Sequence, residues 1–300
     1  MLIRQTINTQ GGWLGAGLAP TIRIMSVAQS TSDDVIELDL SRFQFINPMF
    51  VVSLFVYLSR CGKKVLFHNA QDYHQAIHLP EFGLNTDGLR QSALLAIMER
   101  YSSKTFVPIV NFSALTNGDE RDVVSTAIES IIIRQLNIPA NVAQGLRYMI
   151  SETIDNIPEH SQAERGFIFA QAYPVGGFLD LCIADNGITL RGSYEKTDQI
   201  EVTSDLEAIR AANERVSSKN RPDCEGRGFG IYTVKKMLTT GLHGQYLIAS
   251  GDSLYVKGRG YDNYYHIPAG LRWDGTIVAL RIPYQDNETN KLFDCYKYTE

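Results

Sequence analysis

The sequence predicts a protein of the α/β (α+β) class with two domains. Its 300 residues are about twice the usual domain length of ~150 residues. Strand-like stretches alternate with helix-like stretches over roughly the first 90 residues, which is typical of a small α/β unit. The hydrophobic content of 44%, with 20% charged residues, allows each half to bury a core.

The composition also narrows the partners and the compartment. The net charge of -5 and the pI of about 5.7 argue against a nucleic acid or an anionic membrane surface, so we expect neither as a partner. No apolar run approaches the ~18 to 20 residues that span a bilayer. The four cysteines are too far apart for a metal or redox motif, which favours a reduced, cytoplasmic compartment.

The first domain, expected over residues 1–95, has short elements after an undecided start. Apolar patterning predicts strands over 21–27 and 35–40 and a buried helix over 48–58. A further strand is expected over 63–69, followed by a helix over 72–84 with a glycine exit.

A connector is expected over 96–120, before a second domain at 121–285 and a polar tail at 286–300. Apolar residues at helical spacing predict two helices in the second domain, and two strands joined by a turn follow them. A long polar segment then precedes a third helix and the closing strands. The expected elements are helices at 123–136, 141–160 and 231–240, strands at 166–175, 176–185 and 275–284, and the polar segment at 188–225.

A carboxylate and an amide lie four residues apart on the helix expected over 141–160. Glu152 and Asn156 project from the same side of that helix, at the edge of its apolar stripe. A carboxylate in a cleft can deprotonate a water molecule, and an amide oxygen can bind Mg²⁺. Alone, the pair is also typical of a solvated helix edge.

Asp185, Asn186 and Gly187 follow directly after an expected strand. A carboxylate at a strand end can accept a hydrogen bond from the exocyclic amine of adenine, and a glycine lets the backbone turn close to the base. Alone, these three residues are simply a good turn.

A glycine-rich segment runs into the helix expected over 231–240. Backbone N–H groups at a helix N-terminus bind anions such as phosphate. A flexible loop explains the segment equally well on its own, and it lacks the preceding strand and the spacing of a Rossmann fingerprint. The segment consists of Gly226, Arg227, Gly228, Phe229 and Gly230.

Together these motifs resemble the ATP-binding domain of the GHKL family, which groups gyrase B, heat-shock chaperones, histidine kinases and mismatch-repair ATPases. SETIDNIPEHS is similar to the family's N box, IADNG and GRGFG to its two glycine boxes, and DGTIVALRIP to its last motif. The resemblance extends from about Val123 to Pro283. It implies a two-layer sandwich in which a mixed sheet carries helices on one face.

The resemblance also implies ATP and Mg²⁺ as cofactors and a role for each motif residue. Glu152 would be the general base, Asn156 the Mg²⁺ ligand, Asp185 the adenine reader and Thr276 a helper at the adenine site. Residues 188–225 would form a lid over the nucleotide, although Thr189 stands where the family commonly has a second glycine. The remaining cofactor-binding residues would be Gly187, Gly226, Gly228, Phe229 and Gly230.

Residues 21–90 resemble a STAS domain, the fold of the anti-sigma-factor antagonists. The helix over 141–160 resembles the corresponding helix of the serine kinases that phosphorylate those antagonists. Where those antagonists have a phosphoacceptor serine, this chain has Pro48 and Met49, so we expect no phosphorylation switch there. Ser53 lies further along the same helix and is expected to pack. The six histidines lack the acceptor motif of a sensor histidine kinase, and His74 and His78 are expected to have a surface or packing role.

Two functions remain open from the sequence. In the first, the chain is an ATPase or an ATP-dependent serine/threonine protein kinase that acts on a partner protein. In the second, it binds ATP without turning it over, and the STAS-like part makes the protein contact. A third alternative is an unrelated α/β protein with coincidental motifs. The sequence does not name the partner, a homodimer is compatible with it, and residues 261–270 either pack as a hairpin or form a partner site.

Overall fold

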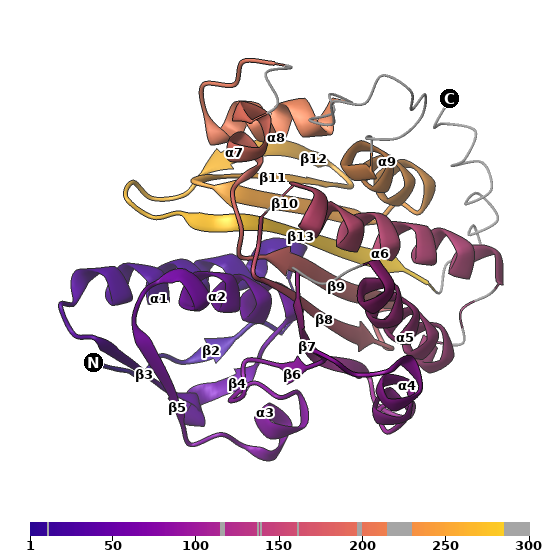
Figure 1. The fold of residues 1–300 in the computed structure, drawn as a ribbon, viewed down its shortest axis with the longest axis horizontal. Helices are drawn as coiled ribbons and strands as arrows, with labels where there is room; N and C mark the ends of the chain where they lie inside the picture. Colours follow the sequence, from indigo (N-terminus) through magenta and orange to yellow (C-terminus); the bar gives the residue numbers. More distant parts are fainter. Residues whose placement is uncertain are drawn as a thin grey trace.

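A mixed β-sheet forms the centre of the structure (Figure 1). The computed structural model describes residues 1–10, 12–114, 118–136, 138, 140–160, 162–196, 200–214 and 230–284. Among these residues the sheet has the order β12-β11-β10-β13-β9-β8-β7-β6, and only β6 and β7 pair in parallel. Its strands are β6 (Leu84–Asn85), β7 (Phe106–Ser113), β8 (Arg165–Tyr173), β9 (Phe178–Asp185), β10 (Gln245–Gly251), β11 (Ser253–Gly258), β12 (Tyr261–His266) and β13 (Trp273–Pro283).

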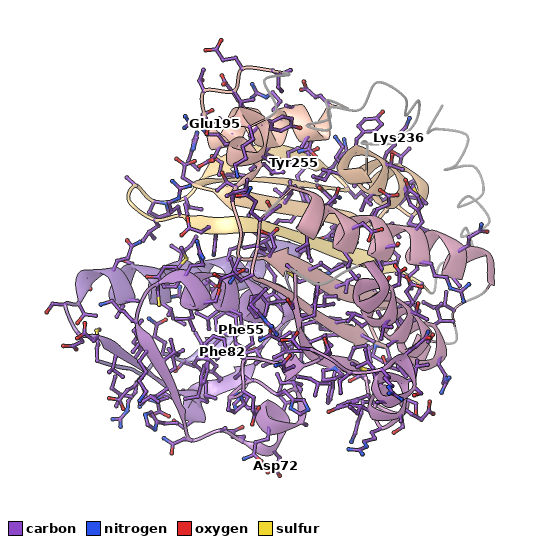
Figure 2. The ribbon with its side chains drawn as sticks, viewed as in Figure 1. Phe55, Asp72, Phe82, Glu195, Lys236 and Tyr255 are labelled. Carbon is purple, nitrogen blue, oxygen red and sulfur yellow. The ribbon has the colours of Figure 1, made fainter. Side chains whose placement is uncertain are left out.

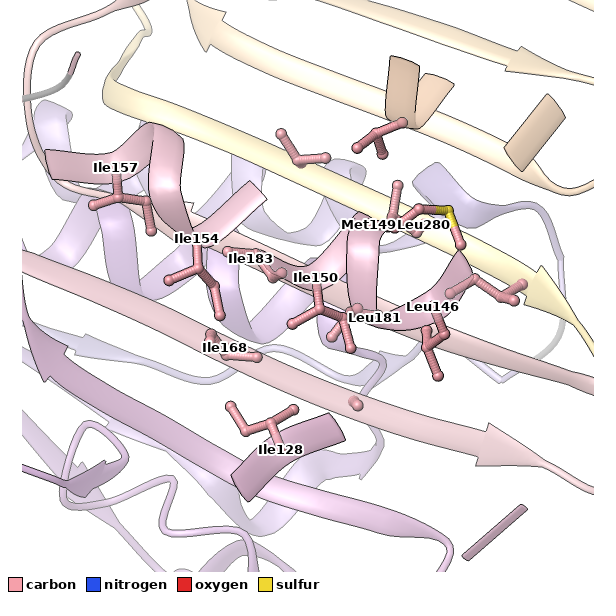
Figure 3. Close-up of a cluster of buried hydrophobic side chains, with 14 of the residues drawn as sticks. Ile128, Leu146, Met149, Ile150, Ile154, Ile157, Ile168, Leu181, Ile183 and Leu280 are labelled. Carbon is pink, nitrogen blue, oxygen red and sulfur yellow. The ribbon is translucent and has the colours of Figure 1, made fainter. Parts of the chain in front are cut away.

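Helices cover one face of this sheet, and α6 supplies much of the core there. Its apolar residues recur every three or four positions, and they pack on Ile168, Leu181 and Leu280 of the sheet (Figure 3). The same repeat predicted this helix from the sequence. The helices on this side are α4 (Gln91–Glu99), α5 (Gly118–Leu136), α6 (Ala140–His160), α7 (Leu190–Glu195), α8 (Asp205–Asn213) and α9 (Gly230–Lys236), which a π turn extends over Met237–Gly241.

The N-terminal residues form a smaller α/β unit around a parallel sheet in the order β1-β3-β5, with β2 and β4 paired beside it. In α2, Asn47 caps the first turn by accepting the N–H of Phe50 at 2.9 Å, and Pro48 occupies the first helical position. The elements are β1 (Leu2–Ile3), β2 (Ile7–Asn8), a 3₁₀ turn (Leu14–Gly17), α1 (Leu18–Ser30), β3 (Val35–Asp39), a second 3₁₀ turn (Leu40–Arg42), β4 (Phe43–Phe45), α2 (Pro48–Arg60), β5 (Lys64–His68) and α3 (Asp72–Ala76).

Helix α2 packs against the other face of the large sheet, on β8, β9 and β13. Its residues are buried on all sides from Pro48 to Leu58. The ring of Phe55 lies tilted against that of Phe82, at 4.8 Å between ring centroids (Figure 2), and Trp273 of β13 donates its indole N–H to the carbonyl of Ser53 at 3.1 Å. The large sheet therefore has helices on both faces, whereas the sequence placed them on one. Although α2 is apolar all round, none of the described helices is long and apolar enough to cross a membrane.

Three segments differ from the sequence prediction. Residues 21–27, expected as a strand, lie in α1, because Leu18, Thr21, Met25 and Ala28 share a buried face at helical spacing. The connector expected at 96–120 contains β7, a buried strand of the large sheet.

The third difference is the helix expected over 72–84, which ends at Ala76. Pro80 has no N–H for a helical hydrogen bond, and His78 and Phe82 adopt positive φ angles of 60° and 57°. The chain therefore leaves the helix after one turn.

His74 is buried at 1% exposure and packs inside the N-terminal unit. Its Nδ1 accepts the N–H of Gln71 at 3.2 Å, and this assigns the proton to Nε2, which donates to the carbonyl of Phe43 at 3.1 Å. Burial lowers the pKa of His74, because it disfavours the charged ring.

We therefore expect His74 to make the fold less stable in mild acid. The unfolded chain takes up this proton near pH 6.5 and the folded chain only at a lower pH, so the contribution falls as the pH decreases below about 6.5. Urea unfolding at pH 7.5 and pH 5.0 should show a larger loss for wild type than for His74→Gln, which keeps a donor and an acceptor but does not titrate. Equal losses would contradict the assignment.

Candidate functional site

Three of the expected site residues meet where α6 and α9 cross. Glu152 and Asn156 are half-buried at the edge of the apolar stripe of α6, as the helical spacing predicts. Gly230, the first residue of α9, lies directly against them: a Cβ atom at this position would be 2.5 Å from Glu152 Oε2 and 3.3 Å from Asn156 Nδ2. A side chain at this position would displace the Glu152 carboxylate, so glycine lets the backbone of α9 approach both polar groups as they stand.

Asp185 and Thr276 lie on the face of the sheet that α6 covers. Leu181 and Ile183 of β9, and Leu280 of β13, belong to the core beneath α6. Because side chains alternate along a strand, Asp185 and Thr276 point to this same face. Their strands are antiparallel neighbours, so the two side chains occupy the same end of the sheet.

Gly275 fixes the approach of these two strands. Its φ of +113° is in a region that favours glycine, and a Cβ atom there would overlap the backbone carbonyl of Asp185. The glycine before Thr276 is therefore required by the backbone itself. It brings β13 against the end of β9.

The residues around Asp185 form a tight turn. Asp185 Oδ1 accepts the N–H of Gly187 at 2.9 Å, which leaves Oδ2 outside this turn contact. The Asn186 side chain accepts the N–H of Arg165 at 2.9 Å and donates to Ser59 Oγ of α2 at 3.3 Å. The N-terminal unit therefore contacts the residue between Asp185 and Gly187.

Ser250 is a polar residue of this region that the sequence did not indicate. It pairs with Thr276 across β10 and β13, and the two hydroxyl oxygens are 3.4 Å apart. Ser250 Oγ also donates to the carbonyl of Gly275 and accepts the N–H of Leu190, both at 2.9 Å. Only the register of β10 against β13 reveals this position, and no local motif signals it.

The region expected as a lid, 188–225, is described in part and contains α7 and α8. Lys235 of α9 donates to the carbonyl of Asn213 in α8 at 2.5 Å, so the two helices that flank residues 215–229 are joined. Burial, and after it the charge of Lys257, lower the pKa of Lys235 to about 8. Gly226, Gly228 and Phe229 lie outside the described residues.

The described polar groups at α6 and at the sheet can be compared with what an adenine nucleotide and a Mg²⁺ ion would require. Asn156 has an amide oxygen, a ligand type that Mg²⁺ accepts, Glu152 has a carboxylate that can accept a proton, and both lie beside the backbone of Gly230. Asp185 is a carboxylate at 4% exposure on the same face of the sheet as Thr276, and hydrogen-bond acceptors of this kind are what the amine of adenine requires. The arrangement therefore offers oxygen ligands at α6 and an acceptor for a base at the sheet.

Comparisons of the chain with protein-family models, curated proteins and solved structures found no significant match.

Proposed function

We propose that the chain is an ATP-binding regulatory protein of the GHKL type, a Mg²⁺-dependent ATPase or an ATP-dependent protein kinase that acts on a partner protein. The contact of Gly230 with Glu152 and Asn156 carries the proposal, because it joins two motifs that lie far apart in the sequence. Coincidental motifs would have no reason to meet at one point. The mixed β-sheet, with α6 packed on one face, supports the same assignment.

In this proposal each residue has a separate task. The Glu152 carboxylate accepts a proton from a water molecule or a hydroxyl, and Asn156 holds Mg²⁺ through its amide oxygen. Asp185 accepts a hydrogen bond from the amine of adenine, and Thr276 lies beside it on the same face. ATP, when bound, supplies the phosphoryl group, and Mg²⁺ offsets the charge of its phosphates.

A second candidate function is an ATP-gated interaction module without catalysis. The hydrogen bond from Asn186 to Ser59 Oγ favours it, because it connects the residue beside Asp185 directly to α2. A change at Asp185 on nucleotide binding would then reach the N-terminal unit through one side chain.

The N-terminal unit is proposed to be STAS-like and to serve as the protein contact. Its parallel β1-β3-β5 sheet and α2 support this view. Pro48 and Met49 begin α2, and neither side chain carries a hydroxyl that could be phosphorylated. Ser53 is buried, and its hydroxyl lies 2.9 Å from that of Thr21, in agreement with the packing role expected from the sequence.

The proposal predicts that Asp185→Asn weakens ATP binding by about tenfold to a hundredfold, the cost of losing one hydrogen bond to a charged acceptor. Asparagine keeps the acceptor for Gly187 but can place a donor against the donor of adenine. Calorimetric titration of the chain with ATP and MgCl₂ measures the effect, and GTP, which has an acceptor in place of the amine, should bind more weakly than ATP.

Asp155→Asn is the matched control, since Asp155 lies on α6 away from the apolar stripe and from Gly230. It should bind ATP as wild type does. The proposal fails if wild type binds no ATP, or if Asp185→Asn binds it equally well while folded.

A further inference from the structure

Strand β12 forms an edge of the large sheet, at the end opposite β6 (Figure 1). Among the described residues its backbone pairs only with β11. An exposed edge strand can pair with another chain, and natural proteins often prevent this with lysine, proline or a bulge in that strand. The sequence of β12, YDNYYH, has neither lysine nor proline, and its register with β11 is continuous. Within the described part of the chain, the edge at β12 is therefore open to a further strand.

The backbone groups at this edge come from alternate residues. Ile267, just after β12, donates its N–H to the carbonyl of Asp252 at 2.9 Å, in the same register as the β11–β12 pairs. Hydrogen-bonded pairs alternate along an antiparallel ladder, so the backbone groups of Asp262, Tyr264 and His266 point away from β11. Each of these three residues offers one N–H donor and one carbonyl acceptor to a strand placed beside β12.

This arrangement is complementary to itself. In an antiparallel pair of two β12 strands centred on Tyr264, this residue lies opposite its own copy, and Asp262 lies opposite His266 of the second copy. Every outward backbone group of the three residues is then paired. Each carboxylate also faces an imidazole, which is a favourable cross-strand pair when the imidazole is protonated. Helix α8 packs chiefly on β10 and β11, so it leaves room beside β12.

Asp262 and His266 have neighbours within the chain and remain accessible. Asp262 accepts a hydrogen bond from the ammonium group of Lys257 at 2.6 Å, and its side chain is 53% exposed. Nδ1 of His266 lies 3.0 Å from Ser253 Oγ and 3.6 Å from Asp252 Oδ1, and the His266 side chain is 59% exposed. Nε2 of His266 takes no part in these contacts, so it can donate to a second carboxylate when the ring is protonated.

We propose that the chain forms a two-fold symmetric dimer in which two β12 strands pair and the two large sheets continue into one another. A second copy is the occupant that the edge selects, because its outward backbone groups and its two charged side chains match themselves in one register. An unrelated extended peptide would pair with the backbone but would leave the charges unmatched. The dimer does not depend on ATP, so it is tested separately from the proposed function.

Cross-linking tests the register. Asn263 lies opposite Tyr265 of the second copy as a non-hydrogen-bonded pair, with Cα atoms about 4.5 Å apart, a distance that a disulfide can bridge. Both positions are exposed, so neither change should disturb the fold. An equal mixture of Asn263→Cys and Tyr265→Cys should form a disulfide-linked dimer on mild oxidation. Each variant alone should form far less, because its two new thiols are diagonal neighbours about 7 to 8 Å apart. Wild type corrects for the natural cysteines.

Sedimentation velocity over a wide range of concentrations, at pH about 6, measures the association. His266→Asp should raise the dimer dissociation constant about tenfold or more, because it places two carboxylates opposite each other at two points of the interface. Asp262→His/His266→Asp should recover most of the affinity, since each carboxylate again faces an imidazole. The double variant keeps the new carboxylate beside Asp252, so the recovery has to come from the second copy.

His243→Asp is the matched control. It makes the same change of charge at an exposed residue outside β12, whose φ of 53° aspartate tolerates, and it should dimerise as wild type does. The proposal is overturned if wild type stays monomeric at every concentration, or if the mixture of cysteine variants cross-links no more than the single variants. It is also overturned if Asp262→His/His266→Asp associates no more tightly than His266→Asp.

Discussion

Glu152→Gln is expected to lower the rate of phosphate release from ATP by about 10²- to 10⁴-fold, the usual contribution of a general base. Glutamine has nearly the same shape but cannot accept the proton. ATP affinity should change little, because the adenine contacts at Asp185 and the amide of Asn156 remain. The measurement compares steady-state phosphate release with equilibrium binding for the same two proteins.

Gly230→Ala tests the same carboxylate without removing it. The new Cβ would come within 2.5 Å of Glu152 Oε2, the end of a flexible side chain, so the carboxylate moves while the fold is retained. Phosphate release should fall, and the unfolding temperature should stay close to that of wild type. Asp155→Asn, on the same helix, should leave both unchanged.

The opposite outcome has a definite meaning. If wild type binds ATP but Glu152→Gln and wild type release phosphate at equal rates, Glu152 is not a general base. If neither protein releases phosphate, the chain would be an ATP-gated interaction module, and the Asn186–Ser59 contact would be the first place to seek its output.

Local sequence patterns predicted the elements whose buried residues recur at one regular spacing along the chain. The stripe on α6 and the buried helix over 48–58 were predicted, because apolar patterning depends on neighbours in sequence. Residues 21–27 were assigned wrongly, because a short apolar run fits a strand and a buried helix equally well. Packing on α2 decides between them.

Contacts between distant segments were beyond the sequence. A uniformly apolar α2 indicates burial but does not say against which sheet, and its second face proved to cover β8, β9 and β13. Ser250 was identified as a residue of the candidate site only from the register of β10 against β13. Sequence motifs indicated Glu152, Asn156 and Gly230 separately, but only the tertiary structure shows that they lie against one another.

Arg281→Met is expected to destabilise the fold by about 3 to 5 kcal/mol, the cost of leaving a buried charge without its partner. Arg281 of β13 lies opposite Asp180 of β9 and binds both carboxylate oxygens, at 2.7 and 2.8 Å. Asp180 is only 1% exposed, so water cannot replace the lost donors. Urea unfolding at pH 7 measures the free energy of unfolding for both proteins.

The double variant Asp180→Leu/Arg281→Met separates the charge from the remaining contacts. Arg281 also donates to the carbonyl of Gly12 at 2.7 Å and lies 4.1 Å from the ring centroid of Phe178. If the unpaired Asp180 carboxylate causes the loss of stability in Arg281→Met, removing both charges should restore most of it, since an apolar pair needs no hydrogen bonds. A double variant as unstable as Arg281→Met would instead assign the loss to Gly12 and Phe178. Arg281 would then serve chiefly to hold the N-terminal residues, through Gly12, on the sheet whose far end carries Asp185 and Thr276.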